Sequence, residues 1–180
     1  MDCLEGRGPA DVMELVDRLG AWMLVASGLT DSVEEGETLC RRAVSSGKAL
    51  ELFLANVARQ GGDVAKLHAL RGRYRSPFSA ELKAGSSGFI LSIDAWKIDT
   101  AGVHLGVGRN TTSDSVSSDV GFIFNKKKGD AVTEGDLVAT VYGKDRESLE
   151  PAMALSREAL CIAADRPALS SAILEELSAS

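Results

Sequence analysis

The sequence contains few cysteines and few aromatic residues, and both shortages limit what the chain can be. Its three cysteines, Cys3, Cys40 and Cys161, are odd in number and widely spaced, and no Cys-x-x-Cys pair occurs among them. Neither a disulfide framework nor a zinc site is therefore indicated. Aromatic residues make up 5% of the chain, so we expect a core built mostly from Leu, Val, Ile and Ala. The sequence predicts no metal site and no cofactor.

The sequence also lacks an excess of basic residues and a long apolar run. Its formal net charge is -6 and its pI is about 5.0, whereas nucleic-acid binding requires a basic face. The only basic cluster, Lys126 to Lys128, is interpreted as a solvated turn. No apolar run reaches the roughly 18 residues of a membrane span, and the first residues do not form a signal peptide. We expect a soluble, cytoplasmic protein that binds neither nucleic acid nor membranes.

Apolar residues at spacings of three and four predict three helices within residues 1–70. Pro9 is typical of the first helical position and Gly28 of a helix end. Ser32 and Glu35 form the pattern of a capping box at the start of the second helix. The three apolar stripes are Val12, Leu15, Val16, Leu19, Met23 and Ala26; Leu39, Cys40, Ala43 and Val44; and Leu50, Phe53, Leu54 and Val57.

After the helical region the pattern changes to short β-rich runs. Residues 71–87 contain glycines and a Ser-Pro pair, which indicates a connector with one short strand around residues 78–83. Further strands are predicted at 89–93, 120–124 and 137–142, with a short helix at 99–106 and a last helix that starts near Pro151 and runs through Ile162. Helices first and a mixed β region second predict an α+β fold.

Several short motifs after residue 87 resemble the C-terminal domain of thymidine and pyrimidine-nucleoside phosphorylases. They are Gly88-Phe89-Ile90, Ile98-Asp99-Thr100, Leu105-Gly106-Val107-Gly108-Arg109, Asp119-Val120-Gly121 and Lys128-Gly129-Asp130-Ala131-Val132. In the helical region, Gly8-Pro9-Ala10-Asp11-Val12, Ser46-Gly47-Lys48-Ala49 and Gln60-Gly61-Gly62-Asp63 follow the family's order as well. The resemblance covers nearly the whole chain; one departure is Val107, where family members usually carry Ala.

The resemblance implies a domain plan and a fold. Residues 1–70 correspond to a helical segment of the phosphorylase α/β domain, residues 71–87 to a connector, and residues 88–180 to the C-terminal domain. That domain is expected to be a small mixed β module of the barrel-sandwich (hammerhead) kind with a C-terminal helix. Without the sheet on which the helices pack in the family, apolar residues such as Leu15, Leu19, Met23, Phe53 and Leu54 are expected to lose their cover, to repack against the β region or to meet a protein partner.

The resemblance also implies a reaction, in which phosphate attacks the anomeric carbon of a pyrimidine nucleoside and releases the base. In the family, a Lys-x-Ser-x-Gly-Gly loop and His, Arg, Ser and Lys residues hold phosphate and base, and all of them precede the part matched here. Such chemistry needs a cradle of backbone N–H groups for the anion and donors for the leaving base. The sequence contains no Lys-x-Ser-x-Gly-Gly motif. We therefore predict no catalytic residue, and a C-terminal fragment that is inactive alone.

Two interpretations of the loop 108–118 remain open from the sequence. The loop 108–118 carries Arg109 and Asp114, which form either a structural ion pair or part of a lid that closes over the substrate cleft of the intact enzyme. His68 and His104 are interpreted as packing or surface residues, and the charges of Glu34, Glu35 and Glu37 as favourable to a helix start. Two functional classes are alternatives to a phosphorylase fragment: a non-catalytic interaction or regulatory remnant, and a biotinyl- or lipoyl-type carrier.

The carrier reading depends on one lysine. Residues 129–137 also resemble the strand-turn pattern of biotinyl and lipoyl domains, which place an acceptor lysine at a hairpin tip just downstream. The corresponding residue is Lys144, but its neighbours do not match the acceptor motif. A charged residue that leads into the final helix is the favoured interpretation of Lys144.

Overall fold

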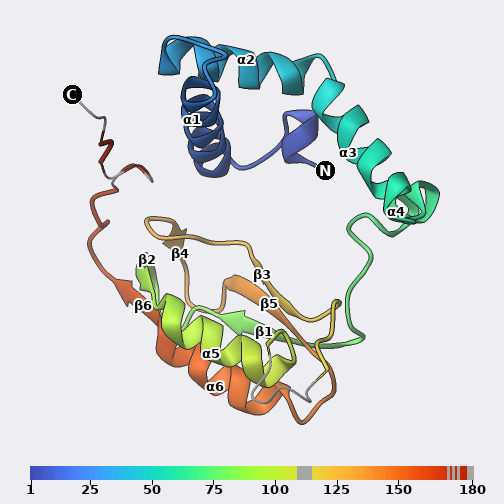
Figure 1. Ribbon diagram of the computed structural model, residues 1–180. Coiled ribbons are helices and arrows are strands. Elements are labelled where there is room, and N and C mark those ends of the chain that lie inside the picture. The colour runs from blue at the N-terminus through green and yellow to red at the C-terminus, as the bar shows by residue number, and fades with distance from the viewer. Residues whose placement is uncertain (109–114, 170, 172, 174, 178–180) are drawn as a thin grey trace. The chain divides into compact units, whose positions relative to one another are not determined.

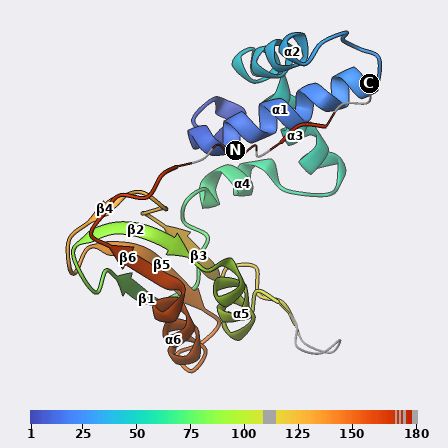
Figure 2. The ribbon, with the colours of Figure 1, turned by 90° about the vertical axis from the view of Figure 1, so that its left-hand side faces the viewer.

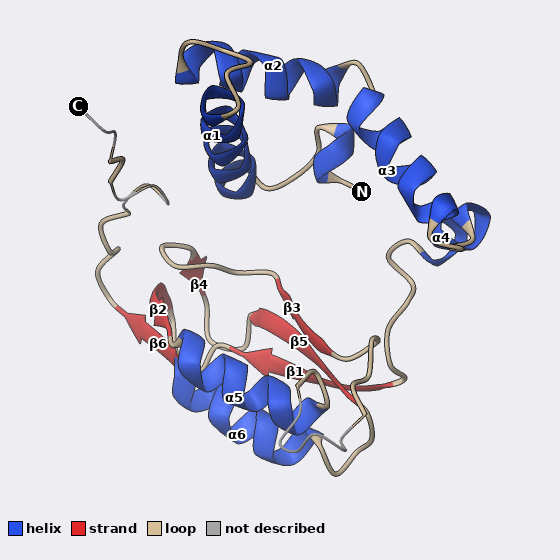
Figure 3. Ribbon diagram, viewed as in Figure 1, coloured by secondary structure: helices blue, strands red, loops and turns tan. Residues whose placement is uncertain are grey.

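The computed structural model describes residues 1–108, 115–169, 171, 173 and 175–177 of the chain (Figure 1). The chain divides into two compact units: Met1–Arg71 with the C-terminal residues from Ser170 onward, and Gly72–Leu169. Within the described residues the first unit is helical, and all strands belong to the second (Figure 3).

The helical unit contains a 3-10 turn, Cys3–Glu5, and the helices α1 (Ala10–Ala26), α2 (Val33–Ser45), α3 (Lys48–Arg59) and α4 (Val64–Leu70). The three predicted helices are confirmed. Pro9 is the N-cap of α1 and not its first helical residue. The predicted cap of α2 is present, because the backbone N–H of Glu35 donates to Ser32 Oγ at 3.2 Å. Helix α4 was not predicted, because seven residues are too few to show an apolar stripe.

Helices α1 and α2 approach each other closely because small residues face one another. Ala21 on α1 is fully buried, and a Cβ atom added at Gly36 on α2 would lie only 2.8 Å from its Cα. One turn before Ala21, the residue Asp17 is only 6% exposed, and its carboxylate accepts a hydrogen bond from Arg41 Nε at 2.9 Å. The contact therefore combines close backbone packing with one ion pair at its edge.

The second unit contains six strands and two helices. They are β1 (Phe78–Lys83), β2 (Gly88–Ile93), α5 (Ala95–Leu105), β3 (Gly121–Phe124), β4 (Ala131–Val132), β5 (Leu137–Gly143), α6 (Leu149–Ala159) and β6 (Leu160–Ala163). One antiparallel sheet has the order β1-β5-β3 and the other the order β4-β2-β6. Helices α5 and α6 lie side by side in both views (Figures 1 and 2).

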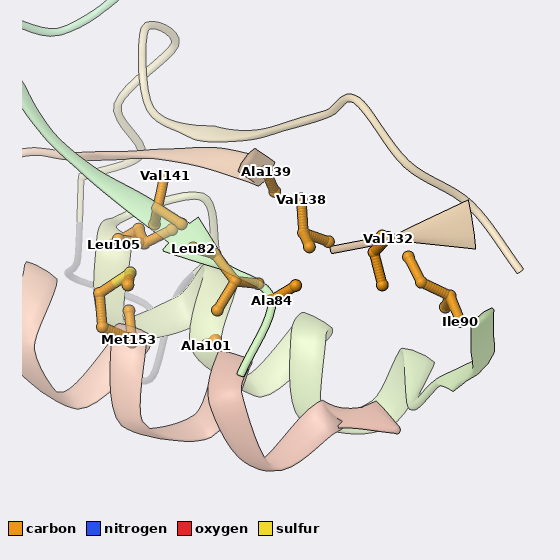
Figure 4. Packing of buried hydrophobic residues seen from close by; sticks show 11 residues of the cluster. Leu82, Ala84, Ile90, Ala101, Leu105, Val132, Val138, Ala139, Val141 and Met153 are labelled. Atoms are coloured by element: carbon orange, nitrogen blue, oxygen red, sulfur yellow. The ribbon is translucent and has the colours of Figure 1, made fainter. Parts of the chain in front are cut away.

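The core of this unit is aliphatic, as the scarcity of aromatic residues predicts. Its buried members come from both sheets and both helices (Figure 4): Leu82, Ala84, Ile90, Ala101, Leu105, Val132, Val138, Ala139, Val141, Ala152 and Met153. Phe122 and Phe124 are only partly buried at its margin. Strand β5 contributes Val138, Ala139 and Val141, so the central strand of its sheet carries much of the packing.

The structure corrects two expectations about the β region and confirms a third. The described strands form two separate three-stranded sheets and no closed barrel, because β1 and β3 are the edges of one sheet and β4 and β6 the edges of the other. The last helix ends at Ala159, and Leu160–Ala163 pairs with β2 instead of continuing it. The short strand predicted at residues 78–83 is confirmed; it pairs with β5 over its whole length.

Helix α5 is longer than predicted at its N-terminus. It starts at Ala95 because the carboxylate of Asp94 accepts hydrogen bonds from the backbone N–H groups of Trp96 and Lys97, at 3.0 and 3.2 Å. It ends at Leu105 and is capped by Gly106, whose φ of 103° is unfavourable for other residues. The α+β class is confirmed.

Candidate functional site

The predicted lid residues Arg109 and Asp114 lie outside the described residues, so the readings of that loop stay predictions. The two ends of the loop are described. At its start, Gly106 accepts a hydrogen bond through its carbonyl from the N–H of Ser117, at 3.0 Å. At its end, the carbonyl of Asp119 accepts from the N–H of Ser76, at 2.8 Å. The loop therefore begins and ends at fixed points on the second unit.

Polar residues just before β1 surround the end of this loop. The hydroxyls of Tyr74 and Ser118 are 2.8 Å apart, and the guanidinium of Arg75 donates to Tyr142 Oη at 3.0 Å. The same guanidinium lies 5.7 Å from the centre of the Tyr142 ring, in the range of a cation–π contact. The buried Ser76 donates its hydroxyl to a backbone carbonyl of β5 at 2.6 Å.

This cluster of Tyr74, Arg75, Ser76, Ser118 and Tyr142 can position a loop. Its hydrogen bonds join hydroxyls, a backbone carbonyl and one guanidinium. The cluster includes no paired carboxylates and no nucleophile beside a base. The cluster was not predicted from the sequence, since Tyr74, Arg75 and Ser76 stand in the expected connector, Ser118 in the loop 108–118 and Tyr142 in the strand 137–142. The Ser-Pro pair at Ser76 was the one local signal, and it was interpreted only as a break between elements.

The remaining titratable candidates show no shared site. His68 and His104 are exposed on α4 and α5, each in a different unit. Glu34 and Glu35 lie in the first turn of α2, as predicted for charges that favour a helix start. Within the described residues, no group of three His, Cys, Asp or Glu side chains is arranged to hold a metal ion.

Lys144 does not occupy the position that a carrier lysine requires. It is exposed and follows β5 directly, and its backbone N–H donates to the carbonyl of Leu105 at 3.1 Å. The next element is the helix α6, so Lys144 stands in a strand-to-helix connection and not at a hairpin tip. The structure therefore supports the interpretation of Lys144 as a residue leading into the final helix.

A group of ion pairs connects α1 and α2. Arg41 contacts Asp17 at 2.9 Å and Glu37 at 2.8 Å, and Glu37 also contacts Arg18 at 3.0 Å. The hydrogen bonds that Arg41 donates to Glu37 and Asp17 raise the pKa of its guanidinium. Burial, followed by the negative charges of Asp17 and Glu37, raises the pKa of the nearby Cys40 thiol. These charges pair with one another between α1 and α2, so the group serves the contact of the two helices and offers no unpaired acid or base.

A stripe of exposed apolar residues follows α1 on the side away from α2. We call it the α1 stripe, and its members, with their exposed fractions, are Val12 (39%), Leu15 (37%), Val16 (52%), Leu19 (56%) and Met23 (73%). Of the residues expected to lose their cover, Phe53 and Leu54 are instead half-buried on α3.

The C-terminal residues cover only part of the α1 stripe. A hollow of about 620 Å³ is lined by Leu15, Leu19 and Trp22 on α1 together with Ile173 and Glu176 of the tail. There the carboxylate of Glu176 accepts from Trp22 Nε1 at 3.1 Å. The exposed fractions given above for the α1 stripe already include these contacts with the tail.

Comparisons with known proteins agree on one family. The family model described as Pyrimidine nucleoside phosphorylase C-terminal domain matches residues 89–163, which run from β2 to the end of β6. A pyrimidine-nucleoside phosphorylase of Staphylococcus haemolyticus is 37% identical over 150 residues, which are 83% of this chain and 34% of that protein. The corresponding protein of Staphylococcus aureus strain USA300 is 35% identical over 147 residues, 82% of this chain and 34% of its own length.

The fold and the matched range thus define the β-rich unit as a phosphorylase C-terminal domain of mixed α+β class. The chain belongs to the thymidine and pyrimidine-nucleoside phosphorylase family and corresponds to its C-terminal portion. It spans about a third of the length of the relatives it matches. No helix in the described residues is both long and apolar enough to cross a membrane.

Proposed function

We propose that these 180 residues act as the C-terminal portion of a pyrimidine-nucleoside phosphorylase fold and do not catalyse phosphorolysis alone. In this proposal, residues 1–70 are the last helices of the phosphorylase α/β domain, residues 71–87 the connector and residues 88–180 the C-terminal domain. The groups that hold phosphate and the departing pyrimidine come from the rest of the family fold. The absence of a Lys-x-Ser-x-Gly-Gly motif from the 180 residues supports this division.

The observation that carries the proposal is the exposure of the α1 stripe. Five large apolar side chains lie 37–73% exposed along one face of α1, while the opposite face buries Asp17 and Ala21 against α2. Full burial of such a side chain contributes about 1.5–3 kcal/mol, so a contiguous exposed face of this kind marks an interaction surface. The sheet on which these helices pack in the family is the partner that the resemblance implies.

Co-purification tests this proposal. The chain is co-expressed with a tagged segment that comprises the remaining part of the Staphylococcus haemolyticus relative, and retention of the chain on the affinity resin is measured. We expect the chain to be retained, because the segment supplies the missing cover for the α1 stripe. No complex under any condition in which both pieces are soluble would contradict the proposal.

Two double variants make the experiment specific. L19E/M23E places two carboxylates on the α1 stripe at a spacing of four residues and is expected to prevent retention. A65E/A69E places two carboxylates at the same spacing on α4, where both alanines are already exposed, and is expected to leave retention unchanged. Equal retention of the two variants would show that the stripe is not the surface used.

The loop 108–118 is proposed to act in the intact enzyme as a lid over the substrate cleft. Backbone hydrogen bonds hold the chain at Gly106 and at Asp119, and these two attachment points support the proposal. We expect Arg109→Ala in a chimaera that joins the Staphylococcus haemolyticus segment to this chain to raise KM or to slow turnover. Unchanged kinetics would leave Arg109 and Asp114 with a structural role only.

A second candidate is a non-catalytic regulatory subunit, which the same exposed stripe favours. In that case the purified chain would bind a complete phosphorylase and change its rate. The two functions separate when the chain is titrated into the full-length Staphylococcus haemolyticus enzyme. A C-terminal portion is expected to leave the rate unchanged, since the surface it needs is already occupied there.

A further inference from the structure

The C-terminal tail of the chain contacts α1 along one line of the helix surface. The hydroxyl of Ser171 donates to the carboxylate of Glu14 at 3.0 Å. The carboxylate of Glu176 lies 3.2 Å from Nε of Arg18 and accepts from Nε1 of Trp22 at 3.1 Å. Glu14, Arg18 and Trp22 follow one another at intervals of four residues, so these contacts fall on one side of α1. The name tail residues is used here for Ser171, Ile173, Glu175, Glu176 and Leu177.

The order of these contacts gives the direction of the tail. Ser171 contacts α1 at Glu14, and Glu176 contacts it about two turns later, so the tail residues follow the helix in its own direction. Helix α1 rises about 12 Å from Glu14 to Trp22. A chain of five residues, the separation of Ser171 and Glu176, spans at most about 17 Å, so both contacts can form at the same time.

The tail residues also take up part of the space over the α1 stripe. Leu15 and Leu19 of the stripe line the hollow of about 620 Å³ together with Ile173 and Leu177 of the tail. A partner that packs on Leu15 and Leu19 must therefore enter the volume beside Ile173 and Leu177. The tail and such a partner exclude each other at this part of the stripe.

The contacts of the tail are weak enough to be exchanged for others. The side chains of Arg18 and Glu176 are 30% and 33% exposed, and ion pairs that water reaches contribute little to stability. Leu177 is 85% exposed although it lines the hollow. Arg18 also contacts Glu37 at 3.0 Å, so its charge keeps a partner on α2 when Glu176 leaves. Release of the tail therefore spares the contact between α1 and α2.

We propose that the tail residues form a displaceable cover of α1 that competes with the partner of the α1 stripe. This inference rests on the proposed function, in which that partner is the rest of the phosphorylase fold. Only molecules whose tail has left α1 can bind the partner, so the apparent affinity is reduced by the fraction in which the tail is bound. The tail thereby regulates access to the α1 stripe.

Two changes remove the cover in different ways. One is a chain that ends at Leu169, and the other is Glu176→Lys, which places a positive charge beside Arg18. Glu175→Lys is the matched control, because it makes the same change of charge one residue earlier, while the contacts with Arg18 and Trp22 belong to Glu176. All variants are made in a W96F background, which leaves Trp22 as the single tryptophan.

Quenching of Trp22 fluorescence by acrylamide tests the cover without any partner. We expect quenching to increase in the shortened chain and in E176K, because Trp22 loses the tail beside its indole, and to stay unchanged in E175K. Equal quenching of the full-length and the shortened chain would overturn the proposal.

Affinity for the partner tests the competition. The tagged segment of the Staphylococcus haemolyticus relative is immobilised, and the affinity of each purified variant is measured by biolayer interferometry. The shortened chain and E176K are expected to bind about threefold to tenfold more tightly than the full-length chain, and E175K to bind as the full-length chain does. A complex that forms with equal or lower affinity after the tail is removed would overturn the cover and leave the proposed function standing. No complex with any variant would contradict the proposed function and this inference with it.

Discussion

Two glycines in the α1–α2 contact permit a test in which the same substitution has opposite effects. A Cβ atom added at Gly36 would lie 2.8 Å from the Cα and 3.0 Å from the carbonyl oxygen of Ala21, and both are backbone atoms. A Cβ atom added at Gly20 would lie 2.8 Å from Cys40 Sγ, the end of a side chain that can rotate away. Only the first substitution forces the two helices apart.

The expected magnitudes follow from these distances. Replacement of a helix-interior Gly by Ala raises helix stability by about 0.8–1.0 kcal/mol, and this gain is common to both variants. Overpacking of a rigid contact lowers stability by about 1–3 kcal/mol, and this applies only to G36A. We therefore expect the unfolding free energy of the helical unit to be about 1–3 kcal/mol lower in G36A than in G20A. In a unit of this size, the difference corresponds to at least about 4 °C in Tm.

Tryptophan fluorescence provides the assay. Trp22 lies half-buried on α1 beside Ala21, and Trp96 is 79% exposed in the other unit. In a W96F background the remaining signal reports on the helical unit alone. Urea unfolding curves of W96F, W96F/G20A and W96F/G36A are compared. Equal midpoints for the two glycine variants would refute the close α1–α2 packing described above.

Three further predictions concern single side chains. Arg41→Ala is expected to lower the urea midpoint of the helical unit, because it removes the partner, at 2.9 Å, of the carboxylate of Asp17, a residue that is only 6% exposed. Adding D17N should recover part of the loss in the urea midpoint. No recovery would argue against the ion pair. Hydrogen bonding from the backbone N–H of Ser148 lowers the pKa of Asp145, so this contact stabilises the fold above the unfolded-state pKa and the stabilisation is lost as the pH falls through the folded-state pKa. NMR titration of Asp145 should show a midpoint below that of an unstructured aspartate, and a midpoint at the ordinary value would count against the contact. Leu82→Ala, at a side chain only 2% exposed, should lower the stability of the second unit by about 2–5 kcal/mol in thermal unfolding followed by circular dichroism, and a loss well below this range would argue against the core assignment.

The helices and most strands could be predicted because their signals are local. The stripe on α1 and the cap at Ser32 are visible within a few residues of sequence, and both are present in the structure. Strand Leu160–Ala163 was assigned to the last helix, because its apolar residues continue the helical spacing and its pairing with β2 is a tertiary contact. A two-residue strand such as Ala131–Val132 has no periodicity from which to predict it.

The candidate site was less predictable than the fold. Family motifs led to Arg109 and Asp114, which lie outside the described residues. The contacts that anchor the loop come from Tyr74, Ser76 and Tyr142. The first two are distant from Tyr142 in sequence, and the three come together only when β1 pairs with β5. The α1 stripe was predictable as a helix face, and the family resemblance also predicted that it would lose its cover; that Phe53 and Leu54 are half-buried became visible only in the folded unit.

Release of free base from thymidine and uridine in the presence of phosphate is the most direct measurement of whether the chemistry resides in these 180 residues. The chain, purified from a host that lacks nucleoside phosphorylases, is compared with the chimaera that joins it to the Staphylococcus haemolyticus segment. We expect phosphate-dependent base release by the chimaera and none above the blank by the chain alone. Phosphate-dependent turnover by the isolated chain would contradict this expectation.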